Sequence, residues 1–281
     1  MLTILEVIKK TTDFFAAKGV DSARLNAELL IGHALGLKRM ALYLQFERPL
    51  AELELEKIRP LVRRRALREP LQYILGETEF YGLKLKVDRR ALIPRPETEL
   101  LVENVVGAWL TPPASILDLG TGSGAIALAL AQKFPDAQVT AIDASDDALA
   151  LARENAEGAG IGARVEFRRS DWFAEIPGGS KFDLIVANPP YLSAEETAST
   201  APEVRGYEPA SALTADDGGL ADLRAIIAAA PRFLTAGGMV ALETGIAQHP
   251  ALLGLAAGAG FSRMESRPDL TGWDRFILAW L

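Results

Sequence analysis

Two consecutive prolines, Pro189 and Pro190, directly follow the apolar run 182–187 and limit what the chain can form there. A proline has no backbone N–H and a fixed φ, so a β-strand over the apolar run has to stop at this point. Asn188-Pro189-Pro190-Tyr191 is therefore predicted to be a rigid turn at the carboxyl end of a strand. Ligands of open α/β sheets bind at that end of the strands.

The groups that this turn presents suit a flat ligand carrying an NH2 group. The amide oxygen of Asn188 and the proline carbonyls accept hydrogen bonds, and the ring of Tyr191 offers a face for stacking. The alternative is a turn that only ends a strand and packs a tyrosine. Because a motif of four residues needs its context, the choice depends on the rest of the chain.

A glycine-rich turn upstream supplies that context. Residues 116–119 are predicted to be a buried strand, and Gly120-Thr121-Gly122-Ser123-Gly124 leads from it into the helical stretch 125–134. Glycines let a ligand approach the backbone closely at the start of a helix. The next apolar run ends at Asp143, whose carboxylate can accept hydrogen bonds from both hydroxyls of a ribose.

The glycine turn alone leaves other interpretations open. Gly120, Gly122 and Ala125 also satisfy the dinucleotide pattern G-x-G-x-x-A, with an acid about 20 residues further on, as in nicotinamide-dependent oxidoreductases. A tight turn with a purely structural role is a further alternative. The Asn-Pro-Pro-Tyr turn argues against hydride transfer, which has no evident use for it.

Composition excludes several classes of site. The chain has 281 residues with 49% hydrophobic content, enough for one large domain and a small one. It has no cysteine, which excludes disulfides, thiolate metal sites and a cysteine nucleophile. Its two histidines give poor support to a histidine metal site or a Ser-His-Asp triad, so no metal is expected. A net charge of −7 argues against stable binding of nucleic acid.

Targeting signals are absent from the sequence pattern. No apolar run is long enough to span a bilayer, so no membrane association is expected. The N-terminal stretch 1–10 reads as an amphipathic helix and lacks the basic lead and cleavage site of a signal peptide. We expect a cytoplasmic protein.

Hydrophobic periodicity predicts three parts. Residues 1–75 follow a helical period, with a helix from Asp21-Ser22 to a stop at Gly36, a short helix over 38–44 and a longer one over 51–68 with a possible kink at Pro60. Residues 83–88 alternate as in an extended strand, and residues 76–95 are predicted to be a β-hairpin that links this helical domain to a third part, 96–281.

A basic cluster ends the long helix and consists of Arg63, Arg64, Arg65 and Arg68. A solvated helix face is the expected explanation. Docking of an acidic partner is the functional alternative.

The third part predicts an α/β fold. Seven strand candidates alternate with helices, at 115–120, 138–143, 164–170, 182–188, 238–244, 262–268 and 275–281. This alternation favours a mostly parallel sheet covered on both faces. The short connection between the last two candidates fits an antiparallel pair. The stretch 193–217 shows little regular pattern and is predicted to be a long loop beside the site.

In its glycine-rich turn and its Asn-Pro-Pro-Tyr turn the chain resembles a known family. Residues 118–124 resemble the S-adenosylmethionine loop of class I methyltransferases, and Asn188-Pro189-Pro190-Tyr191 resembles the motif of those that methylate planar nitrogens. The stretches 68–74, 79–80, 92–99, 170–173, 207–209 and 217–220 narrow the resemblance to the glutamine methyltransferases of bacterial peptide-chain release factors. In the N-terminal helices only the architecture corresponds.

The resemblance implies a fold and an activity. The fold is α/β, a seven-stranded Rossmann-like class I methyltransferase sheet with an N-terminal helical bundle domain that binds substrate and a β-hairpin linker. The activity is methylation of the side-chain amide nitrogen (N5) of the glutamine in the Gly-Gly-Gln motif of class 1 release factors. The methyl donor is S-adenosylmethionine, the product is S-adenosylhomocysteine, and a monomer is expected.

The resemblance also implies roles for site residues. Cofactor contacts fall on Gly120, Thr121, Gly122, Ser123 and Gly124 for the methionine and ribose parts, Asp143 for the ribose hydroxyls, Trp172 for the adenine, and Asn188. The substrate amide would be held by Asn188, Pro189, Pro190 and Tyr191, of which Asn188, Pro189 and Tyr191 are the candidate catalytic residues.

Two rivals share parts of this pattern. An adenine-N6 DNA methyltransferase uses a similar clamp on a flipped base, but it would be expected to carry a basic cleft and a sizeable recognition domain. A non-catalytic regulator would bind S-adenosylmethionine without turnover.

Overall fold

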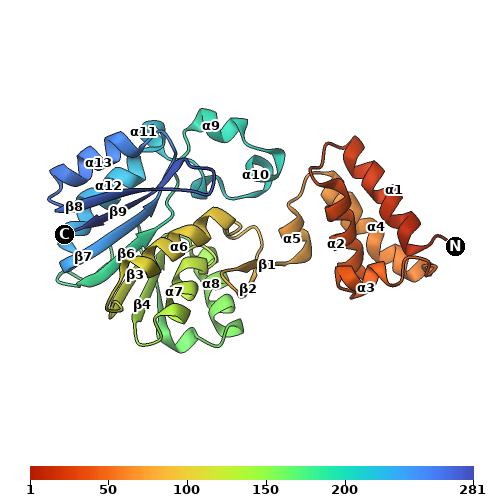
Figure 1. Cartoon of the computed structure of the whole chain (residues 1–281), viewed down its shortest axis with the longest axis horizontal. Coiled ribbons are helices and arrows are strands. Elements are labelled where there is room, and N and C mark those ends of the chain that lie inside the picture. Colours follow the sequence, from red (N-terminus) through yellow and green to blue (C-terminus); the bar gives the residue numbers. More distant parts are fainter. The chain divides into compact units, whose positions relative to one another are not determined.

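The computed structural model describes residues 1–281 and divides into two compact units. Unit 1 consists of Met1–Gly76 and Ala201–Tyr207, and unit 2 of Glu77–Thr200 and Glu208–Leu281. The chain therefore leaves unit 2 after Thr200 and returns to it at Glu208; Figure 1 labels the elements along this path.

Unit 1 is a helical bundle, as the periodicity predicts. Apolar side chains of four of its helices, among them Ile8, Ile31, Leu42 and Ile58, form a buried core. The first helix begins with a capping box, in which the Thr3 hydroxyl accepts from the Glu6 amide and the Glu6 carboxylate accepts from the Thr3 amide. The helices are α1 (Ile4–Ala17), α2 (Ala23–Leu35), α3 (Arg39–Tyr43), α4 (Glu52–Ala66), α5 (Leu71–Leu75) and α10 (Pro202–Tyr207).

The start of α2 differs from the predicted cap. Ser22 precedes the helix, but its backbone is left-handed (φ 49°) and its side chain caps no N–H group. Asn26 instead ties the turn to the helix, since its Nδ2 donates to the carbonyls of Asp21 and Ser22 at 3.0 and 3.3 Å. At the other end Gly36 stops the helix with φ 66°, as predicted.

The basic cluster at the end of α4 is largely engaged inside unit 1. Arg64 pairs with Glu69 at 2.7 Å, and both Arg65 and Arg68 pair with Glu203 of α10, at 2.9 and 2.6 Å. The Arg65 side chain is only 6% exposed. The prediction of a solvated face is therefore wrong for Arg65, because this guanidinium is used to hold residues 201–207.

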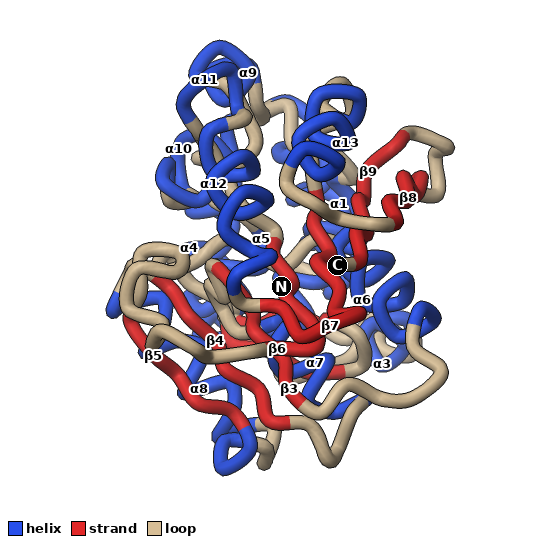
Figure 2. Tube along the Cα trace, turned by 90° about the vertical axis from the view of Figure 1, so that its left-hand side faces the viewer, coloured by secondary structure: helices blue, strands red, loops and turns tan.

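Unit 2 contains the predicted seven-stranded sheet. Its order is β5-β4-β3-β6-β7-β9-β8, with β9 antiparallel to both neighbours and all other pairs parallel. The strands, red in Figure 2, are β3 (Ser115–Leu119), β4 (Gln138–Asp143), β5 (Val165–Arg169), β6 (Phe182–Ala187), β7 (Leu234–Glu243), β8 (Arg263–Pro268) and β9 (Asp274–Trp280). The strand order reverses between β3 and β6, and such a switch point opens a crevice at the carboxyl ends of the strands.

Helices cover both faces of this sheet. Neighbouring residues of one strand enter different cores, since Ile116 packs with α6, α7 and α8 and Leu117 packs with α12 and α13. This alternation explains why the parallel strands read as continuous apolar runs. The helices are α6 (Pro96–Ala108), α7 (Ala125–Lys133), α8 (Asp146–Gly158), α12 (Ala221–Ala229) and α13 (His249–Gly258).

The remaining parts are a hairpin and short helical turns. Strands β1 (Glu77–Phe80) and β2 (Leu83–Lys86) pair antiparallel, as the alternation predicts. The stretch 193–217 is not a structureless loop. It contains α9 (Ala194–Ser199), α10, the 3₁₀ turn Ala210–Ala212 and α11 (Asp216–Gly219). None of the helices is long and apolar enough to cross a lipid bilayer.

Candidate functional site

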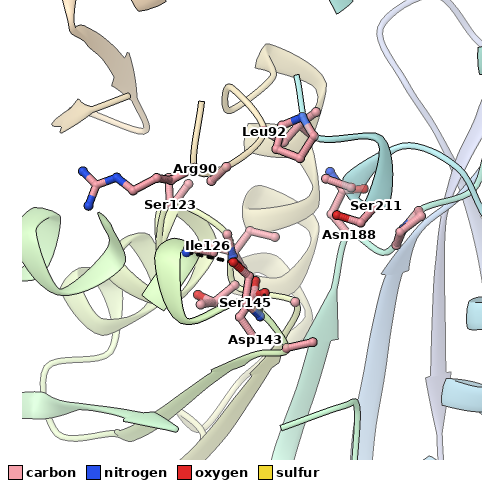
Figure 3. A pocket seen from close by; sticks show the side chains of 18 of the residues that line it. Arg90, Leu92, Ser123, Ile126, Asp143, Ser145, Asn188 and Ser211 are labelled. Atoms are coloured by element: carbon pink, nitrogen blue, oxygen red, sulfur yellow. Dashed lines mark hydrogen bonds between the residues drawn. The ribbon is translucent and has the colours of Figure 1, made fainter. Parts of the chain in front are cut away.

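A cavity of about 350 Å³ lies in unit 2 at the carboxyl ends of the strands on both sides of the switch point. That volume falls within the range of about 300–1,000 Å³ found for small-molecule sites. The turns after β3, β4, β5 and β6 all contribute to its lining, together with the segment before α6 (Figure 3).

The turn after β3 forms the floor of the cavity. Gly120, Gly122 and Gly124 have φ values of 68°, 56° and 85°, a region that other residues rarely adopt. A side chain at position 120 would also have its Cβ 3.4 Å from the ring of Trp172. That distance is an ordinary van der Waals contact, so glycine is favoured here by the backbone conformation and not by lack of space beside the indole.

Asp118 fixes the glycine turn from inside the sheet. It is fully buried, and its Oδ2 accepts from the Thr121 hydroxyl at 2.6 Å and from the Ala127 amide at 3.2 Å. These bonds join the end of β3 to the first turn of α7. Burial raises the pKa of Asp118 from 3.8 to about 7, against the hydrogen bonds that lower it. Its Oδ1 is buried without a partner.

Asp143 has contacts to the same turn and to the cavity. Its Oδ2 accepts from the Gly122 amide and its Oδ1 from the Ser145 amide, both at 2.9 Å. Burial raises the pKa of Asp143, while these backbone N–H groups lower it. Because a carboxylate oxygen can accept more than one hydrogen bond, both oxygens keep acceptor capacity towards the cavity that Asp143 lines.

Trp172 forms a flat wall above the glycine turn. Its backbone is left-handed, with φ 46°, and its carbonyl accepts from the Ser170 hydroxyl at 2.6 Å. The indole Nε1 donates to Asp222 Oδ1 at 3.1 Å. The residue is therefore held through its backbone and its ring nitrogen, and the six-membered part of the indole lies beside Gly120.

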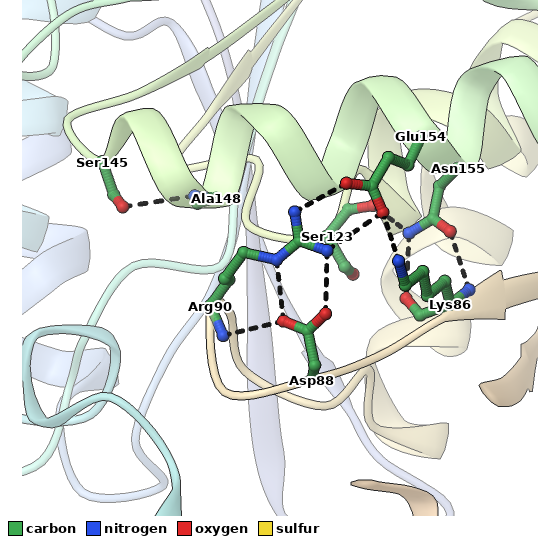
Figure 4. Close-up of polar contacts among 8 residues, drawn as sticks. All are labelled: Lys86, Asp88, Arg90, Ser123, Ser145, Ala148, Glu154 and Asn155. Carbon is green, nitrogen blue, oxygen red and sulfur yellow. Dashed lines mark hydrogen bonds and ion pairs between the residues drawn. The ribbon is translucent and has the colours of Figure 1, made fainter. Parts of the chain in front are cut away.

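The segment from β2 to α6 closes another side, and Asn155 of α8 attaches it to the glycine turn (Figure 4). The Asn155 Oδ1 accepts from the Lys86 amide at 2.7 Å, and its Nδ2 donates to the carbonyls of Lys86 and Ser123 at 3.0 and 2.9 Å. Arg90, which lines the cavity, is held by Asp88 and Glu154. These bonds determine where the segment lies relative to the cavity floor.

Glu208 joins the same segment to the residues after α10. Its side chain is 1% exposed and accepts from Arg95 Nη2 at 2.6 Å and from the Ile93 amide at 3.2 Å. The following residues Pro209 and Ser211 line the cavity. A buried carboxylate thus brings two distant stretches of sequence to one wall.

The turn after β6 is held by the surrounding elements. Gln248 donates from Nε2 to the carbonyls of Tyr191 and Gly219, at 2.9 and 3.1 Å. The Asn188 Nδ2 donates to Thr98 Oγ1 at 3.2 Å, and the Tyr191 hydroxyl donates to Glu243 Oε1 at 3.2 Å. Burial raises the pKa of Tyr191, which keeps the phenol neutral.

Eight of the sequence-predicted site residues line the cavity together, and three do not. The residues in the lining are Gly120, Thr121, Gly122, Ser123, Asp143, Trp172, Asn188 and Pro190. Gly124 is the N-cap residue of α7, and Pro189 is buried. The Tyr191 ring packs against the core that α12 and α13 form on one face of the sheet. The stacking face predicted for Tyr191 is thus not part of the lining.

Several lining residues were not predicted from the sequence. Thr98 and Arg95 lie in the stretch 92–99 that carries the family resemblance. The sequence therefore pointed to this stretch, but it predicted no binding or catalytic role for either residue. Ser211 and Asp222 come from segments without a motif, and only the fold brings them to the cavity. No group of three or more His, Cys, Asp or Glu side chains is arranged to hold a metal ion.

Comparisons with known proteins match both units. A family model described as the PrmC N-terminal domain matches residues 6–76, and one described as the Methyltransferase small domain matches residues 96–206. A protein of Geobacter sulfurreducens named release factor glutamine methyltransferase is 45% identical over 275 residues, which are 98% of this chain and 95% of that protein. A protein of Chlorobaculum tepidum with the same name is 45% identical over 286 residues, covering 97% and 95%.

Among solved structures, the chain is similar to the 16S rRNA N2 G1207 methyltransferase of T. thermophilus in complex with AdoMet and guanosine. The TM-score is 0.52 at 19% identity, covering 73% of this chain and 49% of that one. At this identity the similarity shows that the two share a fold.

Proposed function

The chain belongs to the release factor glutamine methyltransferases, and from this membership we propose that it methylates the side-chain amide nitrogen (N5) of the glutamine in the Gly-Gly-Gln motif of class 1 peptide-chain release factors. The methyl donor is S-adenosylmethionine and the product S-adenosylhomocysteine. The observation that carries the proposal is that the glycine turn after β3 and the Asn-Pro-Pro turn after β6 line one cavity.

The lining of the cavity fits the donor. The positive-φ glycine turn offers close approach to backbone near the start of α7, and Asp143 keeps acceptor capacity for two ribose hydroxyls. We assign Gly120 to Gly124 to the methionine and ribose parts, Asp143 to the ribose hydroxyls and Trp172 to the adenine. The bound donor supplies an activated methyl group on a sulfonium, and no metal is required for the transfer.

The substrate amide needs alignment and charge stabilisation. An amide nitrogen is a poor nucleophile because its lone pair is shared with the carbonyl. We assign to Asn188 Oδ1 and the Pro189 carbonyl the two hydrogens of the amide, with Pro190 and Tyr191 shaping the turn around it. Alignment of reactants can contribute roughly 7–11 kcal/mol. The two oxygen dipoles stabilise positive charge as it develops on nitrogen.

The bond changes balance without a redox partner. A nitrogen–carbon bond forms as the carbon–sulfur bond breaks, and sulfur keeps the electron pair and becomes a neutral thioether. The nitrogen carries a positive charge until it loses one of its two hydrogens, and we assign that proton to water.

The three predicted parts of the chain have different proposed functions. We assign binding of the release factor to the helical domain, residues 1–75, linkage to residues 76–95 and catalysis to residues 96–281. The match of residues 6–76 to the PrmC N-terminal domain model supports treating these helices as a domain of their own. We propose that the protein acts as a monomer and does not form stable complexes with nucleic acid.

Labelled donor tests the proposed function. The protein is incubated with methyl-labelled S-adenosylmethionine and a purified class 1 release factor, and peptide mapping then locates the label. We expect label on the Gly-Gly-Gln glutamine and none on a release factor in which that glutamine is replaced by alanine. Duplex DNA in a parallel reaction tests the adenine-N6 alternative. Label on adenine, or no label on glutamine, would contradict the proposal.

The Asn188→Ala variant tests the assigned clamp. Loss of one preorganised dipole should lower kcat on the order of 10²-fold, while appreciable affinity for S-adenosylmethionine remains. Asn104→Ala is the control, since Asn104 lies on α6 outside the cavity lining and donates to the Leu100 carbonyl. Wild-type turnover in Asn188→Ala would show that the side chain is dispensable.

A further inference from the structure

Behind Asn188 lies a short chain of buried polar side chains. Asn188 Nδ2 donates to Thr98 Oγ1 at 3.2 Å, and the Thr98 hydroxyl donates to Glu243 Oε2 at 2.7 Å. The Tyr191 hydroxyl donates to the other oxygen, Oε1, at 3.2 Å. Thr98 is 4% exposed and Glu243 1%, so the bond between them is shielded from water. The residues come from α6, the end of β7 and the turn after β6.

The hydrogen bonds of this chain run in one direction, because a carboxylate can only accept. The Thr98 hydroxyl has a single proton, which it gives to Glu243, so it presents a lone pair to Asn188. Only the NH2 end of the Asn188 amide can meet that lone pair. The Oδ1 end makes no hydrogen bond within the protein, and Asn188 lines the cavity (Figure 3).

We propose that Thr98 and Glu243 are positioning residues that hold the Asn188 amide with its oxygen towards the substrate glutamine. The inference rests on the proposed function. The oxygen and nitrogen ends of an amide have nearly the same size, so packing alone selects neither orientation. A reversed Asn188 would present N–H groups to the NH2 of glutamine, and two donors would face each other. We call the two hydrogen bonds that join Asn188, Thr98 and Glu243 the relay. The relay prevents that reversal.

The charge of Glu243 sets the direction of the relay. The groups that face it are Thr98 and Glu97 of α6, Tyr191 after β6 and Arg275 of β9. Burial raises the pKa of Glu243 above its ordinary 4.5, whereas the hydrogen bond from Thr98 and the charge of Arg275 lower it. A proton on Oε2 would turn Glu243 into a donor, and the Thr98 hydroxyl could then donate to Asn188 and favour the reversed amide.

Kinetics of Thr98→Val test the relay. The variant keeps the shape of the side chain and removes the hydroxyl, so kcat should fall roughly 10- to 100-fold while both KM values stay within about twofold. Thr98→Ser restores the hydroxyl and should recover most of the loss. Thr244→Val is the matched control. It removes a fully buried hydroxyl beside Glu243 that pairs with His249 instead of the relay, and should leave kcat unchanged.

The pH profile of kcat tests the role of the Glu243 charge. In the wild-type protein kcat should fall on the acid side at a pH above 4.5, the ordinary pKa of a glutamate. Glu243→Gln cannot take up the proton and should lose this acid limb, whatever its kcat. A purely structural Glu243 would leave the acid limb in place.

A second readout requires no turnover. The chain has four asparagines, Asn26, Asn104, Asn155 and Asn188, so labelling with ¹⁵N-asparagine gives few side-chain amide signals, and Asn188→Ala identifies those of Asn188. Hydrogen exchange at the Asn188 NH2 should be faster in Thr98→Val than in the wild-type protein. Asn155 is the internal reference, because its Nδ2 is bonded to two carbonyls elsewhere.

The outcomes separate this inference from the proposed function. Equal exchange at Asn188 in both proteins, with kcat of Thr98→Val within about twofold of wild type, overturns the relay. If the wild-type protein transfers no methyl group to glutamine, the proposed function falls, and the exchange comparison still decides whether Thr98 holds the amide.

Discussion

Asp143 contacts backbone N–H groups of the protein and also lines the cavity. The sequence predicts a carboxylate for a ribose, and the structure adds that each oxygen already accepts a backbone N–H, from Gly122 and Ser145. The residue therefore shapes the glycine turn as well as facing the cavity. Its removal should affect ligand binding directly and also through the turn.

The variant Asp143→Ala should weaken binding of S-adenosylmethionine. Loss of a single hydrogen bond to a charged acceptor costs about 1.5–3 kcal/mol, so loss of the ribose contacts should raise the dissociation constant by at least roughly 10- to 100-fold. Isothermal titration calorimetry measures this. Asp147→Ala, at an exposed position four residues further on, should bind as the wild-type protein does. Unchanged affinity of Asp143→Ala would discard the ribose assignment.

Asp118 makes stability depend on pH. Its pKa rises from 3.8 to about 7 on folding, so between these values the folded chain holds a proton that the unfolded chain has lost. Stability from this group is present below pH 3.8 and is lost as the pH rises towards 7, by about 1.4 kcal/mol per pH unit.

Urea denaturation of Asp118→Asn checks this. The amide keeps an acceptor for Thr121 and Ala127 and does not titrate. Between about pH 5 and pH 7 the free energy of unfolding of the wild-type protein should fall relative to that of the variant. Parallel pH dependences of the two proteins would show that Asp118 is already ionised throughout this range.

At the residue scale, motif spacing predicts the parts of the site that follow strand ends. Gly120, Asp143 and Asn188 each come directly after an apolar run, and strand ends of a parallel sheet share one edge. Thr98 and Glu243 were not predicted as site residues. Their roles arise from hydrogen bonds between α6 and β7, which no local pattern specifies.

At the element scale, the turn after β6 is held by one side chain of the loop before α13. Gln248 donates to the Tyr191 and Gly219 carbonyls and accepts from the Gly245 amide at 2.9 Å. Gly219 has no room for a side chain, because its Cβ would lie 2.2 Å from the Tyr191 carbonyl oxygen. The turn thus depends on close backbone contact as well as on its prolines.

The variant Gln248→Ala should therefore lower stability and loosen the turn. It leaves partly buried carbonyls without donors, at a cost of about 1–3 kcal/mol. Thermal denaturation should show a lower Tm. Gln132→Ala, on the exposed face of α7, should stay within about 0.5 kcal/mol of wild type. If Gln248→Ala and Gln132→Ala have the same Tm, Gln248 does not support the turn.

Strands were predictable to within a residue or two at most ends because apolar runs are bounded by turn residues; β7 begins earlier, at Leu234. The short helices α9 and α10 were not predictable from the sequence, because six residues make too few helical turns for a hydrophobic period to be recognised. The left-handed Ser22 was also missed, because local sequence suggested a conventional cap.

At the scale of the whole molecule, unit 1 is built from two separate stretches. Residues 201–207 belong to it, and Glu203 is the anchor that pairs with Arg65 and Arg68. The guanidinium of Arg65 is 6% exposed and would be left with uncompensated charge if Glu203 were removed.

The variant Glu203→Ala should accordingly destabilise unit 1 by about 1.5–3 kcal/mol, the usual worth of hydrogen bonds between charged groups, because the pairs are half-buried. Hydrogen-exchange mass spectrometry should show faster exchange in 201–207 and at the end of α4. Glu195→Ala, an exposed carboxylate on α9, serves as control. Unaltered exchange in 201–207 would mean that the ion pairs contribute nothing to its attachment.

The two-stretch construction of unit 1 also bears on grafting and chimeras. An N-terminal fragment ending at Gly76 would lack the carboxylate that neutralises its own arginines. Exchanging the first 76 residues between relatives would therefore transplant only part of a unit, and a working hybrid has to carry residues 201–207 from the same parent.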